Sequence, residues 1–513
     1  MFLEKDMNNQ PSVGGVKRIT SNALILFIRI LVITILNLYS VRFVLKGLGN
    51  EDYGVFYTVM GVVMTCSCIF PVLSVSVQRF YSFVMGRNEW SLLREIFSAS
   101  INIVIVSLSA IIILLETIGL YFITTKLQIP FERISESLLI YHCAIITFAF
   151  SFLQIPYIAV VFAHEDMNIY AYISCFDCVL KLIAALLIDT IPFDRLLFYG
   201  PALAFISFCT WLCYFFVSRR YKECRYKKVN EPGIYKKLLS FSGWVMYGGI
   251  AGIGIIQGNN ILLNVFFGPL ANAAYGVANN VYNAFTSLSN SMILPFRPQM
   301  IKSYAASDFN YLNNLFSISN KFIFYVLCAV AIPIVVEMNF IMNLWLGDVS
   351  DEMINFSRLF IVYTIILTMH NPLTIIMQAS GNIKIYHLVV ETIMITCLPV
   401  TWFMFRMGYP PYIAFASMIV LCVIAHGMRL IILKNHYRLF NLRTYVSSII
   451  MPGAFIISLI ILGTYLIHDV LSIGIMRLFY VSLFSLLATL MLVYFIGLSK
   501  QEQVIVNHFF IKH

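Results

Sequence analysis

The sequence predicts an all-α, polytopic membrane protein with about 14 transmembrane helices, arranged as two pseudo-symmetric six-helix lobes followed by two C-terminal helices. Three observations support this fold class: the composition, an internal repeat and a series of long apolar runs. Of the 513 residues, 60% are hydrophobic and only 11% are charged, and the mean hydropathy is +0.86. A soluble domain does not sustain such a composition over this length, so most of the chain is expected to lie in lipid.

A degenerate repeat relates the two halves of the chain. The stretch from Asn37 to Phe80 returns as the stretch from Asn260 to Met300. Each copy ends one apolar helix at a Gly-containing turn, resumes at a Tyr-Gly pair and runs to a Gln. These residues are Gly47, Gly49, Tyr53, Gly54 and Gln78 in the first copy, and Gly268, Pro269, Tyr275, Gly276 and Gln299 in the second. A repeat of this size is typical of a transporter built from two related halves, with its site where the halves meet.

The apolar runs are long enough to cross a hydrocarbon core of about 30 Å. Six precede the one long polar segment, at 19–43, 56–80, 97–123, 138–162, 169–191 and 196–217, and six follow it, at 241–267, 273–294, 322–345, 354–377, 385–405 and 412–432. Two more, at 445–467 and 473–496, fall outside the repeat. The predicted domains are an N-terminal lobe at 1–218, a linker at 219–240, a C-terminal lobe at 241–437, and two added helices with the tail at 438–513.

The positions of Lys and Arg predict the orientation. The polar segment from Ser218 to Lys237 is dense in basic residues, and most other basic loops fall on the same side as the N-terminus. The opposite loops carry acids such as Asp194 and Asp469. Because basic loops stay in the cytoplasm, the linker and both termini are expected there. The net charge of +10 is thus interpreted as topology, and no nucleic-acid partner is expected.

The 11 cysteines are interpreted as packing residues because they fall mostly inside apolar runs. The close pairs Cys66/Cys68 and Cys175/Cys178 lack the partner clusters and the polar setting of a zinc site. Neither a metal site nor a bound cofactor is therefore expected.

Three stretches carry a family resemblance: SNALILFIRILVITILNLYSVRFVLKGLGNEDYGVFYTVMGVV, SVQRFYSF and, after the linker, LLSFSGWVMYGG. They resemble the bacterial polysaccharide-biosynthesis flippases of the MATE-like (MOP) superfamily, especially the Wzx-type O-antigen and capsule repeat-unit flippases. The resemblance covers essentially the whole chain. It implies a V-shaped pair of helical lobes that carries polyprenyl-diphosphate-linked oligosaccharide repeat units from the inner to the outer leaflet of the bacterial inner membrane by alternating access, for O-antigen, capsule or exopolysaccharide biosynthesis.

The expected partners are the lipid-linked oligosaccharide, membrane lipids, and the glycan polymerase and chain-length machinery. The protein is expected to be a monomer, and a transporter rather than an enzyme. Such a substrate presents a diphosphate, a hydroxyl-rich glycan and a polyisoprenyl tail. The carrier therefore needs cations, amides and a lipid-accessible gap.

Arg29 is the first candidate cation. The helix rise places it about 16 Å beyond Arg18 and so near the bilayer midplane, where an unpaired charge costs at least about 2.5 kcal/mol. A packing role with a paired carboxylate is one interpretation. A role in the substrate pathway is favoured because Asn22, Asn37 and Ser40 lie roughly on the same helical face.

Three further arginines are candidate substrate-binding residues. Arg42, near the outer interface, fits either a functional role or anchoring by snorkelling. Arg79 and Arg297 close the two copies of the second repeat helix on the cytoplasmic side. Anchoring by the positive-inside rule is the favoured interpretation for these two.

Amide side chains are concentrated in the second copy of the repeat. Four polar residues form a stripe along one face of an otherwise apolar helix, and three amides lie on the preceding span. The stripe is Asn279, Asn283, Ser287 and Asn290, and the preceding amides are Gln257, Asn259 and Asn260. One Asn can serve helix packing, but a stripe favours the lining of a wet cavity. Amides donate and accept, so they can bind sugar hydroxyls without fixing one sugar sequence.

Four membrane carboxylates are considered for coupling to a proton or sodium gradient or to the membrane potential: Glu116, Asp177, Glu337 and Glu391. Asp177 and Lys181 are one helical turn apart, which favours a structural pair. Glu116 and Glu337 come late in runs that reach an interface, so solvated, snorkelled side chains are expected. Asp177 and Glu391 are the named coupling candidates.

Two other functions stay open. A MATE-type multidrug or cation antiporter would share the lobes, but its cationic substrates would favour cavity carboxylates over Arg29. A membrane glycan polymerase, ligase or glycosyltransferase would need catalytic acids or metal-binding carboxylates in a sizeable extramembrane loop, and the longest segment between spans is basic. No Walker motif is present, so direct ATP drive is not expected.

Overall fold

The computed structural model describes residues 13–125, 131–192, 194–229, 233–347, 349–437, 440–500 and 502–503, and these contain helices and turns but no strand. Within them, 13 helical segments are long and apolar enough to cross a membrane. The all-α, multi-span prediction is confirmed. The remaining expected span, 273–294, is helical as far as Ile293. It falls short of the others in hydropathy because it carries the amide stripe.

Two compact units make up the chain. The N-terminal unit is Thr20–Met246, and the C-terminal unit is Tyr247–His513 together with the residues up to Ile19. The division falls inside one long helix, α9 (Gly233–Ile293). This helix already begins within the range predicted for the linker, whose residues 230–232 lie outside the described part of the chain, as do the first twelve residues and most of the tail.

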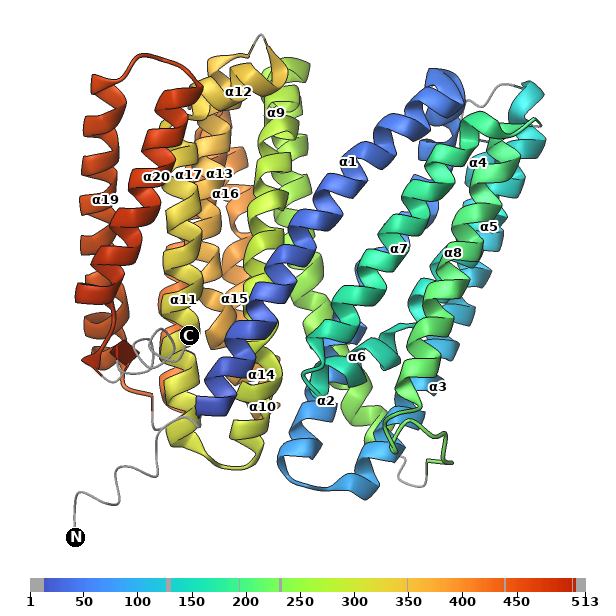
Figure 1. Cartoon of the computed structure of the whole chain (residues 1–513), viewed down its shortest axis with the longest axis horizontal. Coiled ribbons are helices and arrows are strands. Elements are labelled where there is room, and N and C mark those ends of the chain that lie inside the picture. Colours follow the sequence, from blue (N-terminus) through green and yellow to red (C-terminus); the bar gives the residue numbers. More distant parts are fainter. Residues whose placement is uncertain are drawn as a thin grey trace. The chain divides into compact units, whose positions relative to one another are not determined.

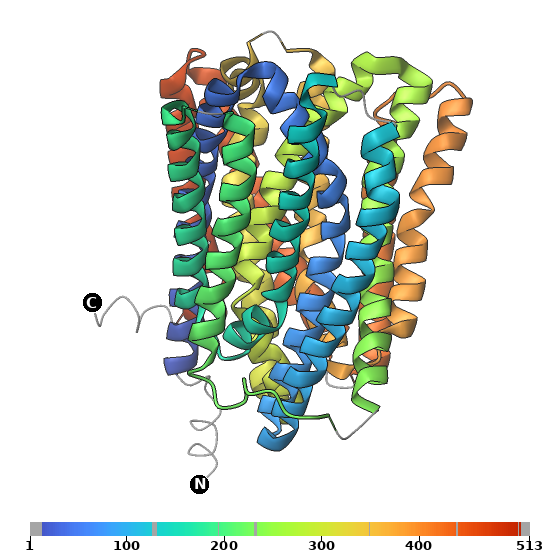
Figure 2. The same cartoon turned by 90° about the vertical axis from the view of Figure 1, so that its right-hand side faces the viewer.

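Helices of the N-terminal unit run roughly parallel to one another (Figure 2). They are α1 (Val13–Met64), α2 (Ile69–Gly86), α3 (Trp90–Leu114), α4 (Leu120–Thr125), α5 (Ile134–Leu153), α6 (Ile155–Ala163), α7 (Met167–Leu187) and α8 (Arg195–Ser218). Their apolar faces form one continuous core, in which Leu93, Tyr141 and Phe148 are fully buried. α5 packs along α8, and α2 packs along α6.

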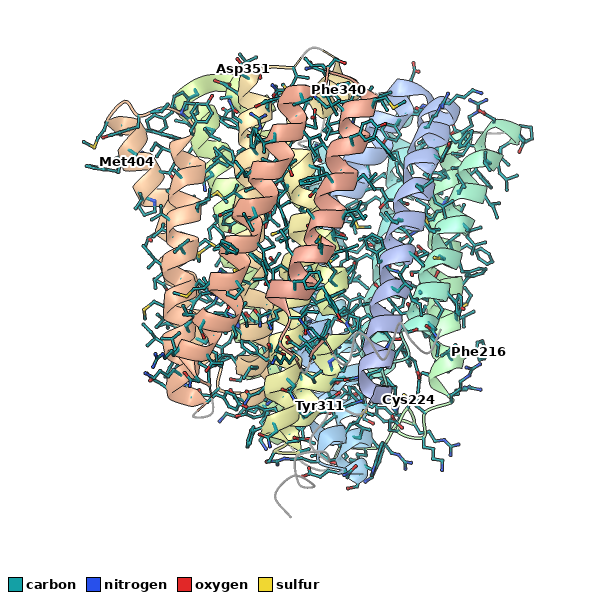
Figure 3. The ribbon with its side chains drawn as sticks, turned by 60° about the vertical axis from the view of Figure 1, so that its left-hand side comes forward. Phe216, Cys224, Tyr311, Phe340, Asp351 and Met404 are labelled. Carbon is teal, nitrogen blue, oxygen red and sulfur yellow. The ribbon has the colours of Figure 1, made fainter. Side chains whose placement is uncertain are left out.

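The C-terminal unit contains the rest of α9 and the helices that follow it. These are α10 (Phe296–Ala305), α11 (Phe309–Val336), α12 (Met338–Leu346), α13 (Asp351–Thr368), α14 (His370–Ser380), α15 (Lys384–Ile395), α16 (Cys397–Arg406), α17 (Ile413–His436), α18 (Leu442–Tyr445), α19 (Met451–Val470) and α20 (Ile475–Leu492). Phe340 and Asp351 lie at one end of this unit, and Tyr311 lies at the opposite end (Figure 3).

The repeat is visible in the backbone. Gly49 interrupts α1 with φ 79° and ψ 169°, and Gly268 interrupts α9 with φ 80° and ψ −171°. This conformation is essentially restricted to glycine. Positive φ angles also occur at Asn88, between α2 and α3, and at Ser307, between α10 and α11. The number of residues from Gly49 to Asn88 equals that from Gly268 to Ser307, so the two copies turn at matching positions.

An ionic network braces the end of the N-terminal unit at which α1 breaks. Arg133 bonds to Asp52 at 3.0 Å and to Asp194, and Asp194 also caps the first backbone N–H groups of α8. Burial alone would raise the pKa of Asp194, but the hydrogen bonds from Arg133 and from α8 hold it below its usual value. Arg195 donates to the carbonyl of Gly47, which supports the chain just before the break.

The segment that follows α8 is attached to the N-terminal unit. Tyr221 donates to Asp166 at 2.6 Å, His164 hydrogen-bonds to Glu223, and Ser98 of α3 accepts a backbone N–H from this segment at 2.8 Å. Glu223 is buried, which alone would raise its pKa, but the bond from His164 lowers it. The described part of the predicted linker therefore packs on the unit rather than extending away from it.

Ion pairs at both ends of the two added helices connect them to α11. α19 and α20 lie side by side (Figure 1). Glu337, just beyond α11, bonds through one carboxylate oxygen to His468 and through the other to Arg477, each at 2.8 Å. At the other end, Lys321 pairs with Glu502 at 2.7 Å. The expectation that Glu337 is solvated is wrong, because the added helices cover its side chain completely.

Replacing the two repeat glycines by alanine tests the account of the helix breaks. We expect Gly49→Ala and Gly268→Ala each to destabilise the protein by about 1–3 kcal/mol, because their φ and ψ angles exclude a side chain. Gly61→Ala and Gly276→Ala are matched controls, since both glycines lie in helical backbone with open space where the added methyl group would lie. Thermal unfolding in detergent measures the effect. Equal shifts in all four variants would contradict it.

Candidate functional site

Arg29 lies where α1 packs against α7, and its partners are uncharged. Its Nε donates to Ser174 Oγ at 2.5 Å, and Nη2 donates to Tyr170 OH at 3.1 Å. The guanidinium also lies over the Tyr170 ring, 4.3 Å from the ring centroid. No described carboxylate forms an ion pair with Arg29. These contacts orient the cation without neutralising it, contrary to the packing interpretation.

The polar residues on one face of α1 differ in burial. Asn22 is buried and donates to the carbonyl of Glu165 at 3.1 Å. Asn37 is exposed and accepts a weak hydrogen bond from the Cys178 thiol at 3.4 Å. Of the residues that favoured a pathway along this face, Asn22 therefore has a structural role, whereas Asn37 keeps part of its amide accessible.

Asp177 is paired with two neighbouring side chains. Its two carboxylate oxygens are occupied by Lys181 at 2.7 Å and by the Thr210 hydroxyl at 3.1 Å. The pairing of Asp177 with Lys181 is as the sequence predicted. The charge of Asp177 is thus paired, and its role as a coupling residue stays a prediction. With Asp177 balanced by Lys181, Arg29 gives the α1–α7 contact a surplus of one positive charge.

The amide stripe also splits in two. Asn283, Ser287 and Asn290 are exposed on the second part of α9, whereas Asn279 is half-buried and its Oδ1 lacks a hydrogen-bond partner. On the first part of α9, Gln257 is exposed and Asn260 is half-buried. Asn259 is fully buried and bonds to the Ile255 carbonyl and the Cys397 thiol, which is a packing role.

The other candidate arginines occupy three different environments. Arg42 is exposed. Arg79 is buried beneath the rings of Phe80, Phe83 and Phe241, with centroid distances of 4.6 to 5.2 Å. Arg79 is therefore not a solvated side chain, and its anchoring by the positive-inside rule stays a prediction. Arg297 is half-buried, and its Nε is buried without a hydrogen-bond partner.

Glu391 belongs to a polar cluster that the sequence analysis did not identify. Its Oε1 lies 3.4 Å from Nδ1 of His387, one turn earlier on α15. Nearby, Arg429 of α17 donates to His370 of α14 at 2.7 Å and to Tyr386 at 3.0 Å. Arg429 lay inside an expected span, but it falls close to the basic end of that span, so the midplane test applied to Arg29 did not select it.

Glu116 differs from Glu391 in its exposure. It lies in the π-helical turn between α3 and α4 and contacts His142 at 3.2 Å, with both side chains partly exposed. The expected solvated character of Glu116 therefore fits its surroundings. Among the described residues, no group of His, Cys, Asp and Glu side chains forms a metal site.

No protein-family model and no curated protein matches the sequence. Solved structures do match. They include an outward-facing MATE family transporter of the MOP superfamily with a TM-score of 0.69, a MATE transporter in complex with MaD3S with 0.70, and a MOP superfamily transporter from Pyrococcus furiosus with 0.69. Each is 14% identical to this chain and covers 82% of it and 96% of its own length. The chain therefore has the MATE transporter fold.

Cysteine substitutions distinguish a wet stripe from a lipid-facing one. In a variant without native cysteines, we expect Asn283→Cys and Asn290→Cys to react with a membrane-impermeant, charged thiol reagent, because both positions are exposed on the polar face of α9. Asn259→Cys, which is fully buried, and Val265→Cys, which is exposed on an apolar face, are the controls and should stay unreactive. Protection of both stripe positions would show that the stripe packs or faces lipid.

Proposed function

We propose that the protein is a flippase of the bacterial inner membrane that moves polyprenyl-diphosphate-linked oligosaccharide repeat units to the outer leaflet by alternating access. The MATE transporter fold supports a transporter. The observation that carries the substrate class is Arg29, a membrane cation with no described carboxylate partner.

The chemistry of Arg29 suits a diphosphate. A guanidinium has five N–H donors in a planar fork that matches phosphate oxygens. Ser174 and Tyr170 engage Nε and Nη2, so the remaining donors are available to a ligand. A diphosphate entering a low-dielectric site must shed water from its charges, and the half-buried Arg29 cation lowers that cost. The anion in turn offsets the burial of Arg29.

The exposed amides suit the glycan. Asn283 and Asn290 present side chains that both donate and accept, as sugar hydroxyls do. Gln257 and Asn37 are exposed and can act in the same way. Because such groups do not demand one arrangement of hydroxyls, they are compatible with glycans of differing composition.

A MATE-type cation exporter is the alternative that the fold favours. Its cationic substrates would need an available carboxylate near the site. In the N-terminal unit the charge at the α1–α7 contact is positive, and Asp177 is already bonded to Lys181 and Thr210. Among the matched structures, the transporter from Pyrococcus furiosus is itself described as having a binding pocket of reverse polarity that suggests a different function. Because transporters of this fold can differ in the charge of the binding site, that charge is the better guide to the substrate.

Substituting Arg29 tests the substrate class. We expect Arg29→Ala to lower export of surface glycan by about 10–100-fold, the effect of losing hydrogen bonds to a charged group worth about 1.5–3 kcal/mol. Arg29→Lys keeps the charge but loses the fork, so it should retain part of the activity. Arg220→Ala, at an exposed position after α8, is the matched control.

Export is measured as surface glycan in cells that lack their own flippase, alongside the amount of protein in the membrane. Intact export by Arg29→Ala would disprove phosphate binding by this residue. Loss of Arg29→Ala from the membrane, with Arg220→Ala unaffected, would instead establish a structural role for the Arg29 contacts.

A further inference from the structure

The Arg29 site has a counterpart at the matching position of the repeat. Arg29 precedes Gly49 by the same number of residues as Gly248 precedes Gly268. On the second helix of each pair, Tyr170 and Ser174 lie as far from the start of α7 as His387 and Glu391 lie from the start of α15. In both units the residue of the first helix contacts the corresponding pair on the second.

The side chains at these matching positions are of opposite chemistry. Where the N-terminal unit has a cation and two hydroxyl groups, the C-terminal unit has a glycine, an imidazole and a carboxylate. Gly248 is required by the close approach. A Cβ atom there would lie 2.8 Å from Nδ1 of His387 and 3.5 Å from Oε1 of Glu391. The absence of a side chain on α9 therefore makes room for the acid–imidazole pair.

His387 is buried without the hydrogen bonds that its ring requires. It is 5% exposed, and neither ring nitrogen has a hydrogen-bond partner. Its Nδ1 lies 3.4 Å from Glu391 Oε1, within ion-pair distance. A neutral imidazole carries one N–H donor, which lacks an acceptor if it lies on Nε2 and lies beside the carboxylate if it is on Nδ1. One proton held between His387 and Glu391 would convert the contact into a charge-assisted hydrogen bond.

Arg429 and His370 are engaged with each other, whereas Nδ1 of His426 is also buried without a hydrogen-bond partner. Arg429 can only donate, so Nδ1 of His370 must accept its hydrogen bond and carries no proton. The His370 ring also stacks on His426, with centroids 4.9 Å apart. The titratable and charged groups packed around Glu391 are Tyr247 on α9, His370 on α14, Tyr386 and His387 on α15, and Cys422, His426 and Arg429 on α17.

We propose that His387 and Glu391 form a proton-binding site, which is the repeat counterpart of the Arg29 site. A sodium ion is not suited to this position, because it needs several oxygen ligands and the cluster offers one carboxylate among imidazoles and the Arg429 guanidinium. A proton needs only the pair itself. As the coupling ion of transport, a role that rests on the proposed flippase function, the proton would switch the charge of this site.

Proton binding is measurable without any glycan. In the full chain reconstituted in lipid, pH-difference infrared spectra should contain the bands of one buried acid–imidazole pair. Glu391→Gln and His387→Gln should each remove these bands, because neither residue holds the proton alone. Glu116→Gln, at the partly exposed Glu116–His142 pair, is the matched control and should retain them. Replacing K⁺ by Na⁺ should leave the spectra unchanged.

Persistence of the bands in either variant, or their displacement by Na⁺, would overturn the site. The link to transport is tested separately in proteoliposomes, with a fluorescent polyprenyl-diphosphate-linked sugar as the probe. A pH gradient should accelerate its movement in the wild type and in Glu116→Gln but not in Glu391→Gln. If the wild type retained the infrared bands but did not move the probe, the flippase proposal would fail and the proton site would stand.

Discussion

Hydrocarbon offers the backbone no hydrogen-bond partner, and the architecture of this chain follows from that constraint. The described spans are helices because a helix satisfies its own N–H and C=O groups. A helix can be interrupted where other groups of the chain stabilise the break. Gly49 and Gly268 supply a conformation closed to other residues, and Arg195 occupies a carbonyl next to the first break. Both units break a long helix at a glycine in the same way. These matching breaks make the repeat recognisable in the sequence, although most side chains of the two copies differ.

The same constraint applies to charged side chains, and the chain meets it in two ways. Glu337 is neutralised by His468 and Arg477, which also fastens the added helices to α11. Arg29 is instead held by hydroxyl groups and an aromatic ring. Neutral partners fix the geometry of a cation but do not neutralise its charge. The first arrangement therefore serves assembly, whereas the second leaves the cation unpaired by any described carboxylate, as the proposed binding of a diphosphate requires.

The features that could be predicted from the sequence depend on local patterns. Hydropathy located the spans, and the Gly-containing turns marked the breaks in α1 and α9. Helix rise placed Arg29 well inside a span, and Arg29 does lie within the apolar helical segment Ser21–Gly49. The partners of Glu337 and the docking of Glu223 on His164 could not be predicted, because they join residues far apart in the chain. Asn259 shows a further limit, since an amide that packs and an amide that faces water give the same pattern on a helix.

Duplication constrains the backbone more strongly than the side chains. Lipid requires both units to satisfy the same peptide groups, so the turns match, but each buried side chain is stabilised by its own neighbours. The positions of Arg29 and Gly248 could therefore diverge without disturbing the helices that carry them. Divergence in charge would also have a physical advantage for the proposed carrier. Two fixed cations at matching positions would bind an anion strongly in every state, whereas one fixed cation and the proposed proton site would allow the affinity to differ between states, which any directed cycle requires.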